Sequence, residues 1–223
     1  MADVHRALAE DFKSQHGRES DDVPQLKMKL TCNPPQLILG KPWLLTRTVT
    51  YEEAPTARSI VIHPYPILGG FDNDPESLHQ CRDEKWEEVE ARDSGESCFM
   101  LWDDDPVRYA VGTTPFYFTC LKPGDTWTKV TRYYSQDETH HFPEEVKVGD
   151  KFQWRYAGAE IDWWDWGAME DHQETKVMHM NGEVTSGNGG RPKLVVSAAT
   201  MEFEVGGDKR LAAAADDTKD VRE

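Results

Sequence analysis

The fold is decided by the stretch Phe116–Tyr134, which reads Phe-Tyr-Phe-Thr-Cys-Leu-Lys-Pro-Gly-Asp-Thr-Trp-Thr-Lys-Val-Thr-Arg-Tyr-Tyr. Residues 116–121 are aromatic, apolar or β-branched, which is typical of a β-strand. In the following Lys-Pro-Gly-Asp segment, Pro123 and Gly124 occupy the positions that a type II turn prefers. Residues 127–134 alternate again, with Trp127, Lys129 and Thr131 on one face. The pattern predicts a β-hairpin that pairs these two strands.

The same two-residue period extends to both sides of this stretch. Leu26, Met28 and Leu30 alternate with polar residues, which predicts a half-buried strand that ends at Asn33-Pro34-Pro35. Residues 69–81 read as a polar loop, and 85–91 as a short helix or an edge strand. Further strands are predicted over 43–51, 59–63, 151–156, 177–180 and 194–205. Short strands without β-α-β alternation predict an all-β protein, an immunoglobulin-like antiparallel β-sandwich.

The sandwich is expected to occupy residues 23–207. Before it, Val4, Leu8 and Phe12 have a helical spacing, so residues 1–22 are predicted to form a short N-terminal helix and a linker. After it, residues 208–223 are Ala-rich and charged, which is typical of a flexible C-terminal tail.

The net charge of the chain limits the classes of molecule that it is expected to bind. The chain has 223 residues, with 25 Lys and Arg against 41 Asp and Glu, and a formal net charge of −16. Such a charge repels phosphate backbones and anionic lipids, so nucleic acid and membranes are excluded, and a protein or a neutral small molecule or sugar is favoured. Without an apolar leader or a membrane-length apolar run, the expected location is cytoplasmic.

Four cysteines are present: Cys32, Cys81, Cys98 and Cys120. Their spacing matches no zinc pattern, so they are predicted to be reduced thiols. No metal and no cofactor is expected.

The most unusual motif is Ile161-Asp-Trp-Trp-Asp-Trp-Gly167. In a regular strand Trp164 and Trp166 would share one face with Asp162, and Trp163 would share the other with Asp165. Trp163 is therefore the ring expected to reach solvent, as a platform that stacks a sugar or a cation beside an acceptor. The interpretation that we favour over this platform is that both faces are buried, because Trp is highly buried on average.

A histidine follows this motif closely. His172 could pair with Asp171 or Glu170, as in a general-base arrangement. The predicted ligand-binding residues are Trp163, Trp164, Asp165, Trp166 and His172. Further along, residues 187–190 (Gly-Asn-Gly-Gly) are predicted to form a hairpin turn.

The region 116–158 resembles small immunoglobulin-like domains. It combines an apolar strand, the Leu-Lys-Pro-Gly turn of residues 121–124, a hairpin strand, and a Val-Gly-Asp turn at 148–150 that leads into an aromatic strand. Similar domains occur in the propeptides of fungal deuterolysin-type metalloproteases and in bacterial intracellular proteinase inhibitors, and the whole chain looks like a fungal protein. The resemblance covers under a quarter of the chain and implies fold more than function. No His-Glu-x-x-His protease signature is present.

Two functions remain open at this point. The first is a non-enzymatic, immunoglobulin-like binding module that recognises a protein partner through loops and an exposed sheet face. The second is a small-molecule enzyme or carbohydrate-binding protein that uses a Trp-rich pocket with His and Asp groups. Catalytic residues can converge from distant positions, so the absence of a contiguous motif does not decide whether the chain is an enzyme. An exposed, converging cluster of Trp, His and carboxylates would favour the second function.

Overall fold

The computed structural model describes residues 23–52, 57–68, 75–90, 106–134, 142–143 and 145–207. Most of this part is β-strand, which confirms an all-β protein, and its helices are three short 3₁₀ turns. The predicted N-terminal helix (1–22) and C-terminal tail (208–223) lie outside the described residues. No helix in the described ranges is long and apolar enough to cross a membrane.

The strands form two large and two small sheets. Sheet A has the order β11-β15-β1-β3-β9, and sheet B the order β2-β16-β10-β5-β6. Sheet C has the order β12-β4-β8, and sheet D the order β14-β13-β7. Neighbouring strands are antiparallel except for β1 with β15 and β2 with β16.

The strand bounds are as follows. Sheet A contains β11 (Ala159–Ile161), β15 (Leu194–Val196), β1 (Leu26–Asn33), β3 (Pro42–Tyr51) and β9 (Thr126–Tyr134). Sheet B contains β2 (Gln36–Ile38), β16 (Ala199–Gly206), β10 (Lys151–Tyr156), β5 (Glu76–Arg82) and β6 (Lys85–Glu88). Sheet C contains β12 (Trp164–Trp166), β4 (Ile60–Ile62) and β8 (Thr119–Leu121). Sheet D contains β14 (Glu183–Val184), β13 (Lys176–Met180) and β7 (Val107–Ala110). The 3₁₀ helices are η1 (Tyr65–Leu68), η2 (Val111–Thr113) and η3 (Met169–His172).

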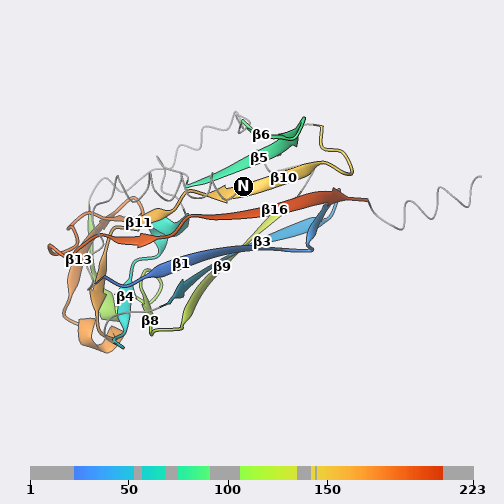
Figure 1. Ribbon diagram of the computed structural model, residues 1–223. Helices are drawn as coiled ribbons and strands as arrows, with labels where there is room; N and C mark the ends of the chain where they lie inside the picture. The colour runs from blue at the N-terminus through green and yellow to red at the C-terminus, as the bar shows by residue number, and fades with distance from the viewer. Residues whose placement is uncertain are drawn as a thin grey trace, which may run out of the picture.

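The long strands of sheets A and B lie in two layers, and the labelled strands of the small sheets gather at one end of them (Figure 1). Aromatic side chains fill the space between the layers. The Trp43 ring of β3 lies 6.1 Å from Trp154 of β10 and 4.6 Å from Phe203 of β16, measured between centroids. These rings are buried because the alternation of each strand points one face inward, as the sequence predicts for β1, β3, β10 and β16.

A buried ion pair also joins the two layers. Arg47 of β3 and Glu76 of β5 form a bidentate pair, and both side chains are 6% exposed. Thr131 Oγ1 accepts a hydrogen bond from Arg47 Nη1 at 2.7 Å, and Trp154 Nε1 donates to Glu76 Oε2 at 2.9 Å. Burial disfavours the charged guanidinium, but hydrogen bonding and attraction to Glu76 outweigh it and raise the pKa of Arg47.

The predicted hairpin is wrong, although its turn is present. Gly124 has a φ of +89°, and the Asp125 N–H donates to the Lys122 carbonyl at 2.8 Å, as in the predicted turn. However, β8 pairs with β4 in sheet C, whereas β9 pairs with β3 in sheet A. The end of β3 holds the turn instead, because the Tyr51 carbonyl accepts from Gly124 N–H at 2.7 Å. The chain therefore crosses from one sheet to another.

Three other expectations need correction. The strand predicted over 116–121 covers only Thr119–Leu121, because Phe116 lies in a turn and is 86% exposed. The predicted loop over 69–81 contains β5 from Glu76 on, where the inward positions carry polar side chains. The Gly-rich turn at 187–190 connects β14 of sheet D to β15 of sheet A, so it is not a hairpin turn.

The ion pair gives the first testable prediction. Glu76→Leu should lower the free energy of unfolding by about 3–5 kcal/mol, because it leaves the Arg47 charge buried without its partner. The double variant Arg47→Met, Glu76→Leu should recover most of that loss, since both charges are gone. Urea denaturation of the three proteins measures this. A double variant less stable than Glu76→Leu would contradict this account of the pair.

Candidate functional site

The Trp-rich segment is bent rather than regular. β11 ends at Ile161, a bend follows at Asp162, and β12 begins at Trp164. Trp163 is 2% exposed and Trp164 is 1% exposed, so the expectation that Trp163 reaches solvent is wrong. Trp166 is the partly exposed ring of the three. The bend turns Trp163 into a second core, away from the one that contains Trp164 and Trp166.

The second core explains the burial of Trp163. It consists of Val61, Val111, Phe118, Trp163, Val177 and Val184, which come from sheets C and D and their connections. The Phe118 ring meets Trp163 edge-on at 5.3 Å between centroids. The Arg191 guanidinium carbon lies 5.5 Å from the centroid of the same ring, in cation-π contact. Trp163 therefore has neighbours on its edge and on its face.

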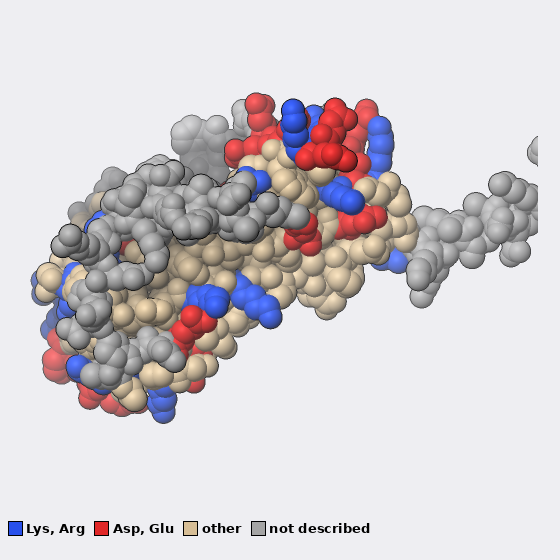
Figure 2. All heavy atoms as spheres, viewed as in Figure 1, with Lys and Arg blue, Asp and Glu red and all other residues tan. Residues whose placement is uncertain are grey.

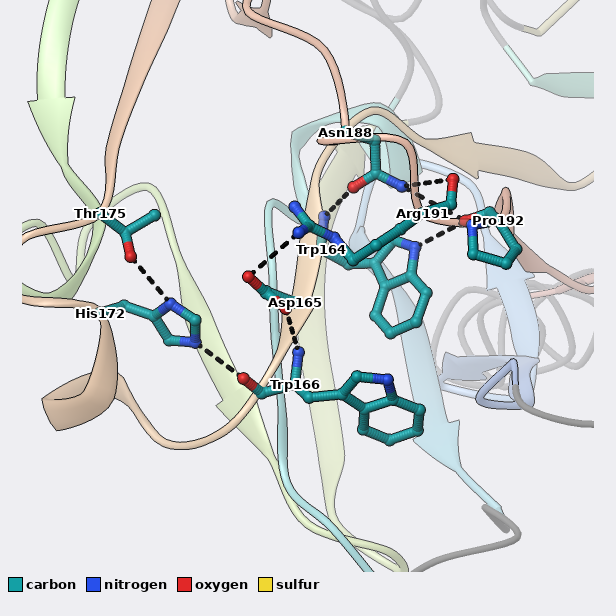
Figure 3. A network of polar contacts seen from close by, with 8 residues as sticks. All are labelled: Trp164, Asp165, Trp166, His172, Thr175, Asn188, Arg191 and Pro192. Carbon is teal, nitrogen blue, oxygen red and sulfur yellow. Dashed lines mark hydrogen bonds and ion pairs between the residues drawn. The ribbon is translucent and has the colours of Figure 1, made fainter.

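Trp164, Asp165 and Trp166 are fixed by polar contacts (Figure 3). Trp164 donates its backbone N–H to Asn188 Oδ1 at 3.0 Å and its indole N–H to the Pro192 carbonyl at 2.9 Å. Asp165 Oδ2 lies 3.1 Å from Arg191 Nη1, on the opposite side of β12 from the two indole rings. These contacts satisfy the polar groups within the protein.

The hydrogen bonds of His172 indicate a structural role. It is 5% exposed, its Nε2 donates to the Trp166 carbonyl at 3.0 Å, and its Nδ1 accepts from Thr175 Oγ1 at 3.2 Å. The expected partner Asp171 instead accepts the Ala168 N–H at 2.8 Å. Gly167 permits this arrangement, because at its φ of +117° a Cβ would lie 2.9 Å from Asp171 Oδ2. The structure therefore does not pair His172 with Asp171 as a general base.

A different imidazole–carboxylate pair exists nearby. His63 follows β4, is fully buried, and its Nδ1 lies 2.9 and 3.0 Å from the two carboxylate oxygens of Asp162. Asp162 Oδ2 also accepts the Val184 N–H at 2.7 Å. Because a carboxylate accepts, Nδ1 carries the proton, and Nε2 of a neutral His63 has its lone pair free. That nitrogen is buried and has no hydrogen-bond partner among the described residues.

A second histidine contacts this pair. The His179 ring of β13 lies 5.5 Å from the His63 ring and 4.9 Å from the Tyr117 ring, between centroids. Burial lowers the pKa of His179, the neighbouring His63 lowers it further, and Asp162 opposes the shift. Its Nε2 is also buried without a partner in the described part of the chain. We define His63, Asp162 and His179 as the imidazole cluster.

Sequence reasoning missed the imidazole cluster because its members are far apart in the chain. His63 and Asp162 are separated by 99 positions, and they lie beside β4 and β12, which are neighbouring strands of sheet C. The only local signal is that His63 lies between a buried strand and two prolines. The chemistry it offers is proton transfer or lone-pair donation by an oriented imidazole. Within the described ranges, no group of three or more His, Cys, Asp or Glu is arranged to hold a metal ion.

Comparisons with known proteins leave the chain without an assigned family. No protein family model matches it, and no curated protein matches its sequence. Among solved structures, it is similar to the sporulation control protein Spo0M of Bacillus subtilis, with 7% identity, a TM-score of 0.31, and coverage of 88% of this chain and 56% of Spo0M. It is also similar to the alkylpurine DNA glycosylase AlkC of Pseudomonas fluorescens bound to abasic DNA, with 12% identity, a TM-score of 0.29, and coverage of 82% and 31%. The chain thus spans about half, or less, of these structures.

The tryptophans give a second prediction. Trp163→Ala and Trp164→Ala should each lower the free energy of unfolding by about 3–5 kcal/mol, because each removes a buried ring. Trp166→Ala should cost clearly less, because its ring is partly exposed. Three urea denaturation curves measure the ranking. A Trp163→Ala variant as stable as the wild type would show that this ring is not part of a core.

Buried histidines predict a loss of stability in mild acid. Burial lowers the pKa of His179, and burial with the charge of Arg155 lowers that of His79. The unfolded chain then binds more protons than the folded chain below about pH 6.5, so stability falls as pH drops from there. Denaturation midpoints between about pH 7.5 and 5.5 should decrease in the wild type. His179→Gln should flatten this slope in part, and His79→Gln combined with it should flatten it further. An equally steep slope in the double variant would contradict the assignment.

Proposed function

We propose that the chain is a non-enzymatic, immunoglobulin-like binding module that recognises a protein partner through the outer face of sheet A. One observation carries this proposal. None of the residues of β1, β3 and β9 is Asp or Glu, although the chain has 41 of them, and these three strands carry four exposed Lys or Arg besides the buried Arg47. The charge of the molecule is therefore unevenly distributed between its surfaces.

The outer face of these strands has a regular composition. Register places Thr50 between Lys27 and Thr126, Thr48 between Lys29 and Thr128, and Thr46 between Thr31 and Val130. The β1 and β9 members of these rows are exposed, and the three β3 members, Thr46, Thr48 and Thr50, are half-buried. We call these nine residues the threonine face.

Sheet B, in contrast, exposes acidic as well as basic side chains. Glu202 and Glu204 of β16 are exposed, as are Glu87 and Glu88 of β6. Figure 2 shows acidic and basic side chains crowded around β5 and β6. The threonine face thus differs from its surroundings in charge and in side-chain type.

Such a face suits protein recognition. Thr side chains are short and restricted at χ1, so ordering them at an interface costs little conformational entropy. Their methyl groups offer apolar contact and their hydroxyls both donate and accept hydrogen bonds. Lys29 adds a positive charge that steers an acidic partner.

A second function is favoured by the imidazole cluster. An imidazole oriented by a carboxylate, with a free nitrogen, is the equipment of a general base, and this observation supports a small-molecule enzyme or sugar-binding protein. The Trp-rich segment supplies one wall of the same region through Trp163. Burial of His63 places this function second, because a substrate reaches its Nε2 only if the surrounding side chains open.

Site-specific cross-linking tests the first function. A photoreactive residue in place of Thr48 or Thr128 should yield the same protein adduct, and the same residue in place of Glu202 on sheet B should yield none. The captured protein is then purified and titrated against the wild type and Lys29→Glu. We expect this variant to bind about tenfold more weakly, since a steering charge is reversed. The proposal would be refuted if the residue at Glu202 gave as much adduct as the residues at Thr48 and Thr128, or if the wild type and Lys29→Glu bound the captured protein equally well.

A further inference from the structure

β9 has an edge that is suited to pairing. It is the last strand of sheet A, and its residues from Thr126 to Tyr134 pair one-to-one with β3. Arg132 and Tyr133 make further contacts, so the edge considered for pairing is the part from Thr126 to Thr131. No strand in the described ranges pairs with its other edge. Natural edge strands are usually protected by shortness, a proline, a bulge or a charged side chain. β9 has no proline, and its unbroken register with β3 excludes a bulge.

The edge is also positively charged. Lys129 lies opposite Arg47 in the ladder, so it projects from the same face as that residue, and it is exposed where Arg47 is buried. An inward-pointing charge at an edge discourages indiscriminate pairing between sheets. The charge of Lys129 also favours an added strand of negative charge, because a carboxylate opposite Lys129 gains an ion pair. A second copy of β9 brings only Lys129 and Arg132 as charges, and the two chains each carry −16.

We propose that β9 accepts an extended acidic polypeptide segment as an additional strand of sheet A. This inference rests on the proposed protein-binding function and specifies its partner. Main-chain hydrogen bonds to the edge supply affinity, and alternate side chains supply specificity. At physiological salt, charges are screened beyond about 8 Å, so the local charge of β1, β3 and β9 matters more to the segment than the distant acidic surface.

The geometry defines the sequence that fits. Val130 belongs to the threonine face and is 51% exposed, whereas Lys129 points to the other face of the sheet. Adjacent residues of an added strand point to opposite faces in the same way. A β-branched residue opposite Val130 therefore stands next to an acidic residue opposite Lys129. Alternating Glu and Val satisfies this requirement in either strand direction.

The test uses a labelled peptide, Thr-Val-Glu-Val-Glu-Val-Thr with blocked ends, titrated with the full chain by fluorescence anisotropy. Lys129→Glu should weaken binding about tenfold, and Lys129→Arg should retain it. Lys151→Glu, at the exposed start of β10 in sheet B, is the matched control and should bind as the wild type does. Circular dichroism melting confirms that each variant is folded.

A second peptide separates strand addition from contact with the face alone. N-methylation of alternate residues removes the donors that an added strand needs, so this peptide should lose binding at least tenfold. Hydrogen exchange of the β9 amides should slow when the unmodified peptide binds. Equal binding of both peptides would overturn strand addition and leave the proposed function standing.

The remaining outcomes are also decisive. A peptide that fails to bind overturns the inference, and the cross-linking result then decides the proposed function separately. Equal binding of a Lys-for-Glu peptide would overturn the charge selection. Tighter binding of a single-stranded oligonucleotide of the same charge would point to nucleic acid and overturn the polypeptide assignment. Concentration-dependent protection of β9 without peptide would instead identify a second copy as the occupant.

Discussion

The ion pair between Arg47 and Glu76 constrains the arrangement of the two large sheets. Each of these charges is costly to bury alone, so β3 and β5 must face each other with both side chains inward. Thr131 and Tyr133 of β9 contact the guanidinium, and Trp154 of β10 donates to the carboxylate. Four strands are thereby tied to one polar centre inside an aromatic core. Apolar side chains can pack in several arrangements, whereas the charged groups of this centre find their partners only when these four strands are arranged as observed.

The same constraint determines the surface. Side chains alternate along β3, so an inward Arg47 requires outward Thr46 and Thr48, and a slip of one residue would exchange them. The register with β1 and β9 then places Lys29 and Thr128 on either side of Thr48. The position of the threonine face is therefore a consequence of the inward orientation of Arg47 and of the register of the strands. Its charge follows from the composition of three strands, and its pattern follows from the pair beneath it.

Much of the fold could be predicted from local alternation, because β1 and β3 each bury one face and the alternating aromatic and apolar residues of β10 and β16 point into the core. β5 escaped prediction because polar groups, among them His79 and Gln80, occupy its buried positions. The prediction of a hairpin was wrong because a turn motif specifies a reversal of the chain and does not specify which sheet each of the two strands joins. For the site, alternation assigned Trp163 and Trp164 to different faces, but the bend at Asp162 and the second core decided that both are buried. The pairing of His63 with Asp162 depends on tertiary structure alone.

The imidazole cluster and the threonine face support different functions, the first through buried groups and the second through exposed ones. A buried nitrogen without a partner destabilises a fold by about 1–3 kcal/mol, and the cluster contains two, which is unusual for a region with no other role. Yet Asp162 holds the Val184 N–H as well as His63, so the carboxylate also joins the small sheets. Any opening that admits a substrate must break contacts that hold these sheets together. The threonine face requires no such rearrangement, because its side chains are already presented at the surface. This difference in accessibility is the reason why we propose binding through sheet A before the second function.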